Sequence, residues 1–209
     1  MNKNSLPEVR IEFSYLIYNM IAKPMWSHFR AGEKLMEPRR AQEVLIKYRE
    51  AWQPHEQAIL QGMCEAFDLR FYKSVLDVYV SPGIPTFSRP TIIITEFDAD
   101  EFIDVLAHEL LHVLITDNTT YDSDEKLGDV LESIYPDYSR LTRNHILVHA
   151  ALKHLYLDVL KEPRRLARDI ENCKKLPDYA KAWEVVEERG YKELIEEFKG
   201  YYGQMTINS

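Results

Sequence analysis

The feature that most constrains this chain is the run DEFIDVLAHELLHVLIT, which covers residues 100–116. Apolar side chains recur all round the helix that this run would form, and a helix that is apolar on every side is normally buried. The run nevertheless carries His108, Glu109 and His112 at its centre. Burying a polar group without a partner costs roughly 1–3 kcal/mol. The run therefore predicts a buried helix whose polar side chains bind something.

The spacing of HELLH suggests what is bound. Four residues turn a helix by about 400°, so His108 and His112 share one face, one turn apart. Two imidazoles placed in this way can hold one Zn²⁺ ion. Glu109 would lie beside the metal, where its carboxylate can take a proton from a metal-bound water and return it to a leaving group. We therefore predict that His108 and His112 are zinc ligands and that Glu109 is a catalytic residue.

Composition sets limits on the partners of this chain. A net charge of −8 argues against a nucleic-acid surface. No run is apolar for long enough to be a signal peptide or a membrane span. The two cysteines, Cys64 and Cys173, lie far apart in helical patterns, which favours reduced thiols over a disulfide. We expect a cytoplasmic protein without a membrane partner.

Hydrophobic periodicity and turn residues predict the order of the elements. Residues 9–21 have the pattern of a strand, or of a strand that leads into a short helix, and two more strands are predicted further on. Helices are predicted on both sides of the HELLH helix. The predicted strands are 70–79 and 89–95, and the predicted helices are 38–52, 54–67, 124–135, 140–161 and two or three within 164–205. We expect a catalytic domain over residues 1–161 and a helical appendage over residues 162–209.

Two strands, a helix with HELLH and a downstream helix with further ligand candidates resemble the zincin superfamily of metallopeptidases. The resemblance covers roughly residues 70–160. It implies an α+β, zincin-like fold with a small mixed sheet packed on the central helix. It also implies a Zn²⁺ cofactor, Glu109 as general base, and an edge strand, here 89–95, that pairs with an extended peptide or protein substrate.

The resemblance does not extend clearly to a subfamily. The metzincin motif continues with Gly and His at positions where this chain has Ile115 and Asn118. The gluzincin subfamily takes a glutamate from a following helix, and Glu132 lies at about that distance. On the predicted helix 124–135, however, Glu132 falls roughly 150° from the centre of the apolar stripe. This position favours a solvated side chain over a ligand.

Histidines of the predicted helix 140–161 are the other candidates for the third ligand. His145 and His149 both fall in its apolar stripe and repeat the four-residue spacing of the first pair. A histidine on an apolar face is often only a packed core residue, but two together downstream of HELLH favour a metal site. We predict His149 as the third ligand. His145 would then act in catalysis, by stabilising an oxyanion, or be a fourth ligand.

The leading hypothesis is therefore a zinc-dependent hydrolase of the zincin peptidase type. If both His145 and His149 bind the metal with His108 and His112, no position is left for water. The chain would then be a metal-stabilised, non-catalytic protein-binding module. A metal-free interaction protein with an acidic helical surface is the third hypothesis.

Overall fold

The structure is a computed structural model that describes residues 6–24, 37–81, 84–89, 91–118 and 121–207. The described residues form a mixed α/β protein that is mostly helical and has a three-stranded sheet. The chain divides into two compact units, which are unit 1 (residues 1–57 and 73–113) and unit 2 (residues 58–72 and 114–209). Compact units are not necessarily independent folding domains, so the predicted division after residue 161 stays a prediction.

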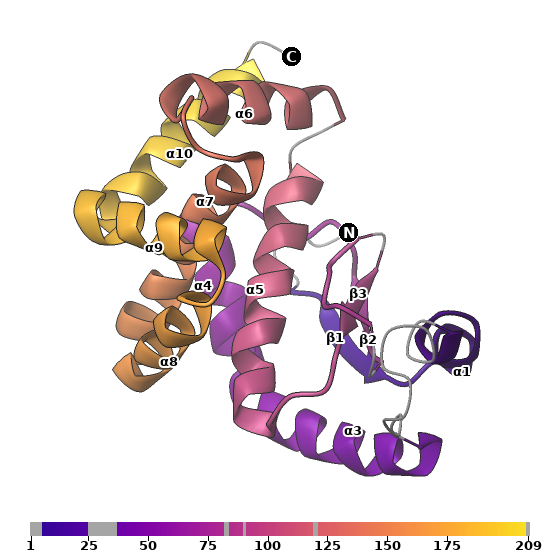
Figure 1. Cartoon of the computed structure of the whole chain (residues 1–209). Coiled ribbons are helices and arrows are strands. Elements are labelled where there is room, and N and C mark those ends of the chain that lie inside the picture. Colours follow the sequence, from indigo (N-terminus) through magenta and orange to yellow (C-terminus); the bar gives the residue numbers. More distant parts are fainter. Residues whose placement is uncertain (1–5, 25–36, 82–83, 90, 119–120, 208–209) are drawn as a thin grey trace. The chain divides into compact units, whose positions relative to one another are not determined.

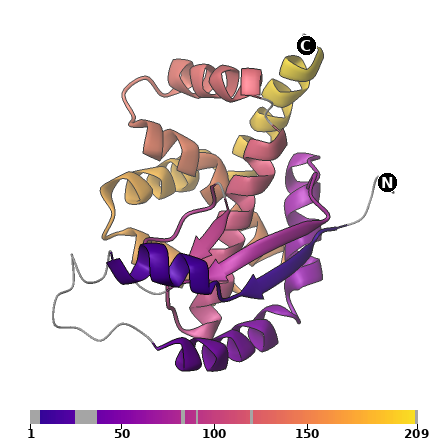
Figure 2. The same ribbon diagram turned by 90° about the vertical axis from the view of Figure 1, so that its right-hand side faces the viewer.

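Unit 1 contains the sheet. The strands β1 (Glu8–Glu12), β2 (Val75–Val80) and β3 (Ile92–Ile94) lie in the order β1-β2-β3 and pair in parallel. Figure 2 shows the arrows of β1 and β2 side by side and pointing the same way. The sequence predicted a mixed sheet, and among the described strands this is wrong. The long connection between β1 and β2, with its helices, returns the chain to the end where it started, which produces a parallel pair.

The outer edge of β3 is covered by the chain's own preceding segment. Ile93 and Phe87 exchange two backbone hydrogen bonds, with N···O distances of 2.8 and 3.0 Å, in an antiparallel bridge. The predicted strand 89–95 is thus shorter than expected and lies at the end of the strand order, as expected. A peptide that paired with Ile93 would have to displace Phe87.

Helical segments follow β1 in the chain, and one of them contacts this strand. After β1 come the short helix α1 (Tyr15–Ile17) and the π-helical turn η1 (Tyr18–Ala22), which confirms the predicted strand leading into a short helix. Helix α3 (Pro38–Trp52) has the predicted bounds, and its Arg49 donates to the carbonyl of Ile11 in β1 at 2.9 Å through Nε.

Helix α5 (Ala99–Asn118) carries HELLH and is buried, as predicted. Its residues 99–113 belong to unit 1. The ring of Phe102 in its first turns stacks on Tyr48 of α3, with centroids 3.9 Å apart and planes 10° apart. Apolar side chains of this helix with at most 8% exposure are Phe102, Ile103, Leu106, Ala107, Leu110, Leu111, Val113, Leu114 and Ile115.

Unit 2 is helical over its described residues. Helices α9 (Pro177–Arg189) and α10 (Tyr191–Ile207) pack against α7 (Arg140–His154), as Figure 1 shows. The predicted helix 140–161 changes at its end into the π-helical turn η2 (Leu155–Val159). Phe67 of α4 meets Phe198 edge to face. The remaining helices are α4 (Glu56–Phe67, in unit 2 from residue 58), α6 (Tyr121–Ile134) and α8 (Pro163–Cys173).

Two further sequence expectations bear on the described residues. Cys64 and Cys173 are both free, as expected. None of the helices formed by the described residues is long and apolar enough to cross a bilayer.

Candidate metal centre

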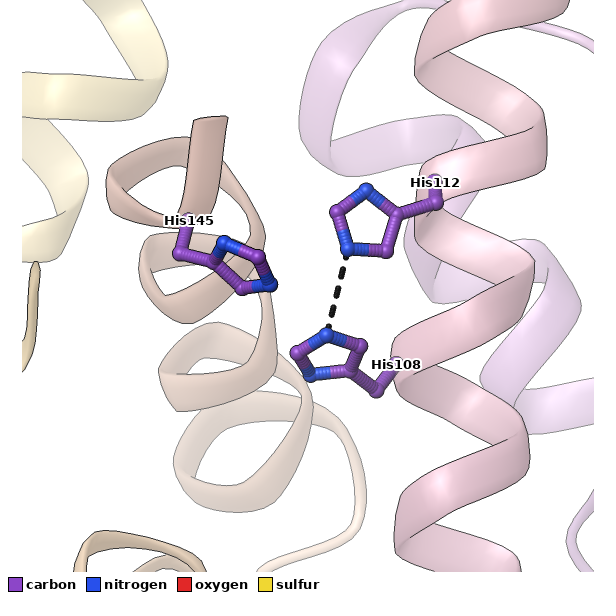
Figure 3. Close-up of side chains that lie close together, drawn as sticks. All are labelled: His108, His112 and His145. Atoms are coloured by element: carbon purple, nitrogen blue, oxygen red, sulfur yellow. Dashed lines mark hydrogen bonds between the residues drawn. The ribbon is translucent and has the colours of Figure 1, made fainter. Parts of the chain in front are cut away.

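The two histidines of HELLH lie on one face of α5 and point at the same place. Their Nε2 atoms are 3.2 Å apart, and their rings meet edge to face, with centroids 4.9 Å apart and planes at 61°. Figure 3 shows both imidazoles, with a dashed line between these nitrogens. Both side chains are half-buried rather than enclosed. The predicted pairing of His108 and His112 is therefore present within unit 1.

The distance between these nitrogens can be compared with what zinc requires. Zinc binds imidazole nitrogen at about 2.0–2.1 Å in tetrahedral geometry, which places two ligand nitrogens roughly 3.3 Å apart. The observed 3.2 Å fits two ligands of one ion. A hydrogen bond between two neutral imidazoles has a similar length, and the metal content of the purified protein distinguishes the two arrangements.

Glu109 follows the first histidine on α5 and is 8% exposed. Burial raises the pKa of its carboxyl group to about 7. A hydrogen bond from the side chain of Ser88 acts in the opposite direction and lowers this pKa, because it favours the charged form. A carboxyl group of this kind can exchange a proton near neutral pH, which is the property of a general base. The sequence did not point to Ser88, which lies in the segment before β3 and is brought to Glu109 only by folding.

His145 lies on α7, in unit 2, and Figure 3 labels it as well. Its side chain is 3% exposed, and its Nδ1 lies 2.7 Å from the carbonyl oxygen of Leu141, one turn earlier. Nδ1 must carry the proton in this hydrogen bond, because a carbonyl oxygen can only accept. Nε2 then keeps its lone pair, and burial lowers the pKa of the ring, which favours the neutral form that binds metals.

His149 lies one turn further along α7 and is fully buried. Its ring stacks on Trp183 of α9, with centroids 4.5 Å apart and planes 12° apart. Within unit 2 it is grouped with Asp169 and Cys173 of α8, as three residues whose ligand atoms lie within 4.8 Å of one another. The buried stripe was predicted for both histidines. Leu141, one turn before His145, is 45% exposed, so the stripe is not buried at the start of the helix.

Glu132, the gluzincin-type candidate, lies on α6 in unit 2. Its side chain is 62% exposed and forms an ion pair with Arg143 on α7, with 3.3 Å between the charged atoms. This position agrees with the solvated side chain that its place on the helix indicated.

Comparisons with known proteins give no independent indication of function. No protein-family model matches this chain, and neither a curated protein nor a solved structure matches it.

Proposed function

We propose that this chain is a zinc-dependent hydrolase of the peptidase type, with His108 and His112 as metal ligands. The observation that carries the proposal is the convergence of their Nε2 atoms at 3.2 Å on a helix that also holds the buried Glu109. The resemblance of HELLH and its surroundings to the zincin superfamily supports the same reaction. A zinc ion held there would lower the pKa of a coordinated water and polarise the substrate carbonyl.

The third ligand stays a prediction, with His149 and His145 of α7 as its candidates. His145 has one property that suits a ligand. The hydrogen bond from its Nδ1 to Leu141 fixes the tautomer in which Nε2 carries the lone pair, and this is the nitrogen form that binds zinc. A metal ligand whose other ring nitrogen is held by a carbonyl is the common arrangement in zinc proteins. His149 has a different set of neighbours in unit 2, which also offers it other metal-binding partners.

Glu109 carries the proton in the proposed reaction. Its carboxylate accepts a proton from the water that attacks the carbonyl carbon of the scissile amide. The C–N bond then breaks, and Glu109 returns the proton to the departing amine nitrogen. Ser88, which bonds the Glu109 side chain, holds the carboxylate in position.

An extended peptide is the substrate that the local sheet geometry favours. Phe87 occupies the outward backbone groups of Ile93, so a substrate strand would add beyond the segment around Phe87. Successive residues of an extended segment direct their backbone groups to opposite sides, so those of Thr86 and Ser88 would face away from β3 in such a pairing. A substrate strand added there would run next to Ser88, the hydrogen-bond partner of Glu109.

Glu109→Gln tests the reaction. The variant should keep the zinc content of the wild type and lose roughly 10²- to 10⁴-fold in the rate of peptide cleavage, because it cannot accept the proton. Cleavage is measured by mass spectrometry on a mixed peptide library, and zinc by elemental analysis of protein purified without added metal. His108→Ala combined with His112→Ala should lose both cleavage and one equivalent of zinc.

Glu132→Gln is the matched control, because it makes the same change on an exposed glutamate. It should keep both zinc and cleavage. If Glu109→Gln cleaves peptides at the wild-type rate, the general-base role is wrong. If the double histidine variant binds as much zinc as the wild type, the site on α5 is wrong.

A further inference from the structure

A second group of metal-binding side chains lies within unit 2. His149 comes from α7, and Asp169 and Cys173 come from α8. One imidazole nitrogen, one carboxylate oxygen and the thiol sulfur all lie within 4.8 Å of one another. None of these residues belongs to HELLH, and the proposed hydrolase reaction does not use them.

The sequence places two of the three side chains on one face of α8. Asp169 and Cys173 are four residues apart, so they lie one turn apart on the helix, as His108 and His112 do on α5. Cys173 is 7% exposed and His149 is fully buried. The stacked ring of Trp183 fixes the plane of the His149 imidazole, so this ligand is held in one orientation.

The donor set indicates which ion would bind. A thiolate and an imidazole together favour zinc over the hard cations calcium and magnesium, and zinc also accepts a carboxylate. Ligand atoms of a tetrahedral zinc site are roughly 3.3–3.6 Å apart, as its bond lengths require. The limit of 4.8 Å exceeds these distances by about 1.2–1.5 Å, which small rotations of the side chains can remove. We propose that His149, Asp169 and Cys173 form a second zinc site in unit 2, in which they supply three of the four ligands.

A catalytic interpretation of the same residues is less favourable. Cysteine, histidine and aspartate also form nucleophilic triads, in which the thiolate attacks a substrate. The thiol of Cys173 is almost fully buried, so substrate cannot reach it.

The proposed ion would connect α7 to α8. Its ligands come from both helices, so binding would favour the folded form of unit 2 over the unfolded chain. An ion bound there would use His149, which would leave His145 as the candidate on α7 for the third ligand of the α5 centre. The inference does not depend on that centre being catalytic, because the two sites share no residue.

Cobalt substitution separates the two sites, because only a site with a thiolate ligand gives a sulfur-to-cobalt charge-transfer absorption in the near ultraviolet. The full chain is stripped with a chelator and titrated with Co²⁺. We expect two equivalents in the wild type, together with this absorption. The double variant His108→Ala, His112→Ala should bind one equivalent of Co²⁺ and keep the full absorption. The triple variant that also carries Cys173→Ser should bind no Co²⁺ and show no such absorption.

Cys64→Ser is the matched control, since Cys64 is the other cysteine of the chain and lies on α4. It should keep the absorption unchanged. If Cys173→Ser does not fold, Asp169→Asn retains the thiol and the imidazole. It should weaken Co²⁺ binding by at least the roughly 10- to 100-fold that loss of an outer-shell partner costs.

The outcomes also separate this inference from the proposed function. Absence of the absorption from wild-type protein that binds one equivalent would overturn the second site and leave the α5 centre standing. The wild type could instead bind a single equivalent of Co²⁺ that is kept in the double histidine variant and lost with Cys173→Ser. This result would support the second site and contradict the proposed hydrolase.

Discussion

The hydroxyl group of Tyr48 forms hydrogen bonds with both backbone groups of Phe97, just before the start of α5. It donates to the carbonyl oxygen at 2.6 Å and accepts from the amide nitrogen at 2.8 Å. Tyr48 is 1% exposed, and its ring stacks on Phe102. One side chain of α3 thus fixes the start of the helix that carries HELLH.

Tyr48→Phe should lower the free energy of unfolding by about 1–3 kcal/mol, because it leaves two backbone groups of Phe97 without their partner. The aromatic stack is retained, so the change isolates the hydroxyl group. Urea denaturation measures the effect. Tyr15→Phe is the control, because Tyr15 is 55% exposed and should change the value by less than about 0.5 kcal/mol. Equal stability of the two variants would contradict the role of Tyr48.

The sequence predicted those parts of the fold that depend on local pattern. The helix over residues 38–52 was predicted with the observed bounds of α3, because helix-forming residues and a shared apolar face mark it and Pro54 ends the run. The strand over residues 70–79 was predicted too early in the chain. The strand begins at Val75, where pairing with Glu8 of β1 begins, and pairing between distant segments cannot be seen in a local pattern.

The candidate site shows the same limit. HELLH identifies His108, Glu109 and His112 because the chemistry needs a fixed helical spacing. Ser88 has no such spacing, since its bond to Glu109 joins two separate segments. His149 carried a signal on its own helix, but its neighbours Asp169 and Cys173 come from α8. Spacing along one helix can be found in a sequence, whereas a pairing between two helices requires the fold.

Substitution by alanine should have opposite effects on stability at two helical glycines. A Cβ atom at Gly62 of α4 would lie 2.9 Å from Leu155 Cδ2 and 2.9 Å from Val159 Cγ2, both in η2. A Cβ atom at Gly128 of α6 would meet no atom within 4 Å. Overpacking by the new methyl group of Gly62→Ala should cost roughly 1–3 kcal/mol. The gain in helix propensity offsets part of this cost, and the variant should still be less stable than the wild type. Gly128→Ala should stabilise it by about 0.5–1 kcal/mol.

Thermal and urea denaturation of both glycine variants measure these changes. The signs are the test, because both substitutions add the same methyl group to a helix. A stabilised Gly62→Ala would mean that η2 moves aside without cost.

Acid should weaken the connection between α7 and α9. Asp178 accepts hydrogen bonds from the hydroxyl groups of Ser139, the N-cap of α7, and Thr142, the latter at 2.8 Å. These bonds lower the pKa of Asp178 below its ordinary value of about 4. A lowered pKa in the folded state stabilises the protein above the unfolded value, and this contribution is lost as pH falls through the folded value.

Asp178→Asn removes that contribution. The stability difference between wild type and variant should be largest at neutral pH and shrink as pH falls below about 4, in urea denaturation at a series of pH values. Thr142→Val keeps the carboxylate but removes one donor, so it should show part of the same pH dependence. A difference that stays constant with pH would contradict the proposed cause.

Ser88→Ala tests whether the segment before β3 takes part in the reaction. The variant keeps the zinc ligands and the carboxylate of Glu109 but removes the hydroxyl group that bonds to it. We expect kcat for peptide cleavage to fall by roughly 10-fold, or about 1.4 kcal/mol in the activation barrier, with zinc content unchanged. Ser133→Ala, on an exposed serine of α6, is the control and should leave kcat unchanged. A change in KM alone would assign Ser88 to substrate binding, and an unchanged kcat and KM would remove it from the site.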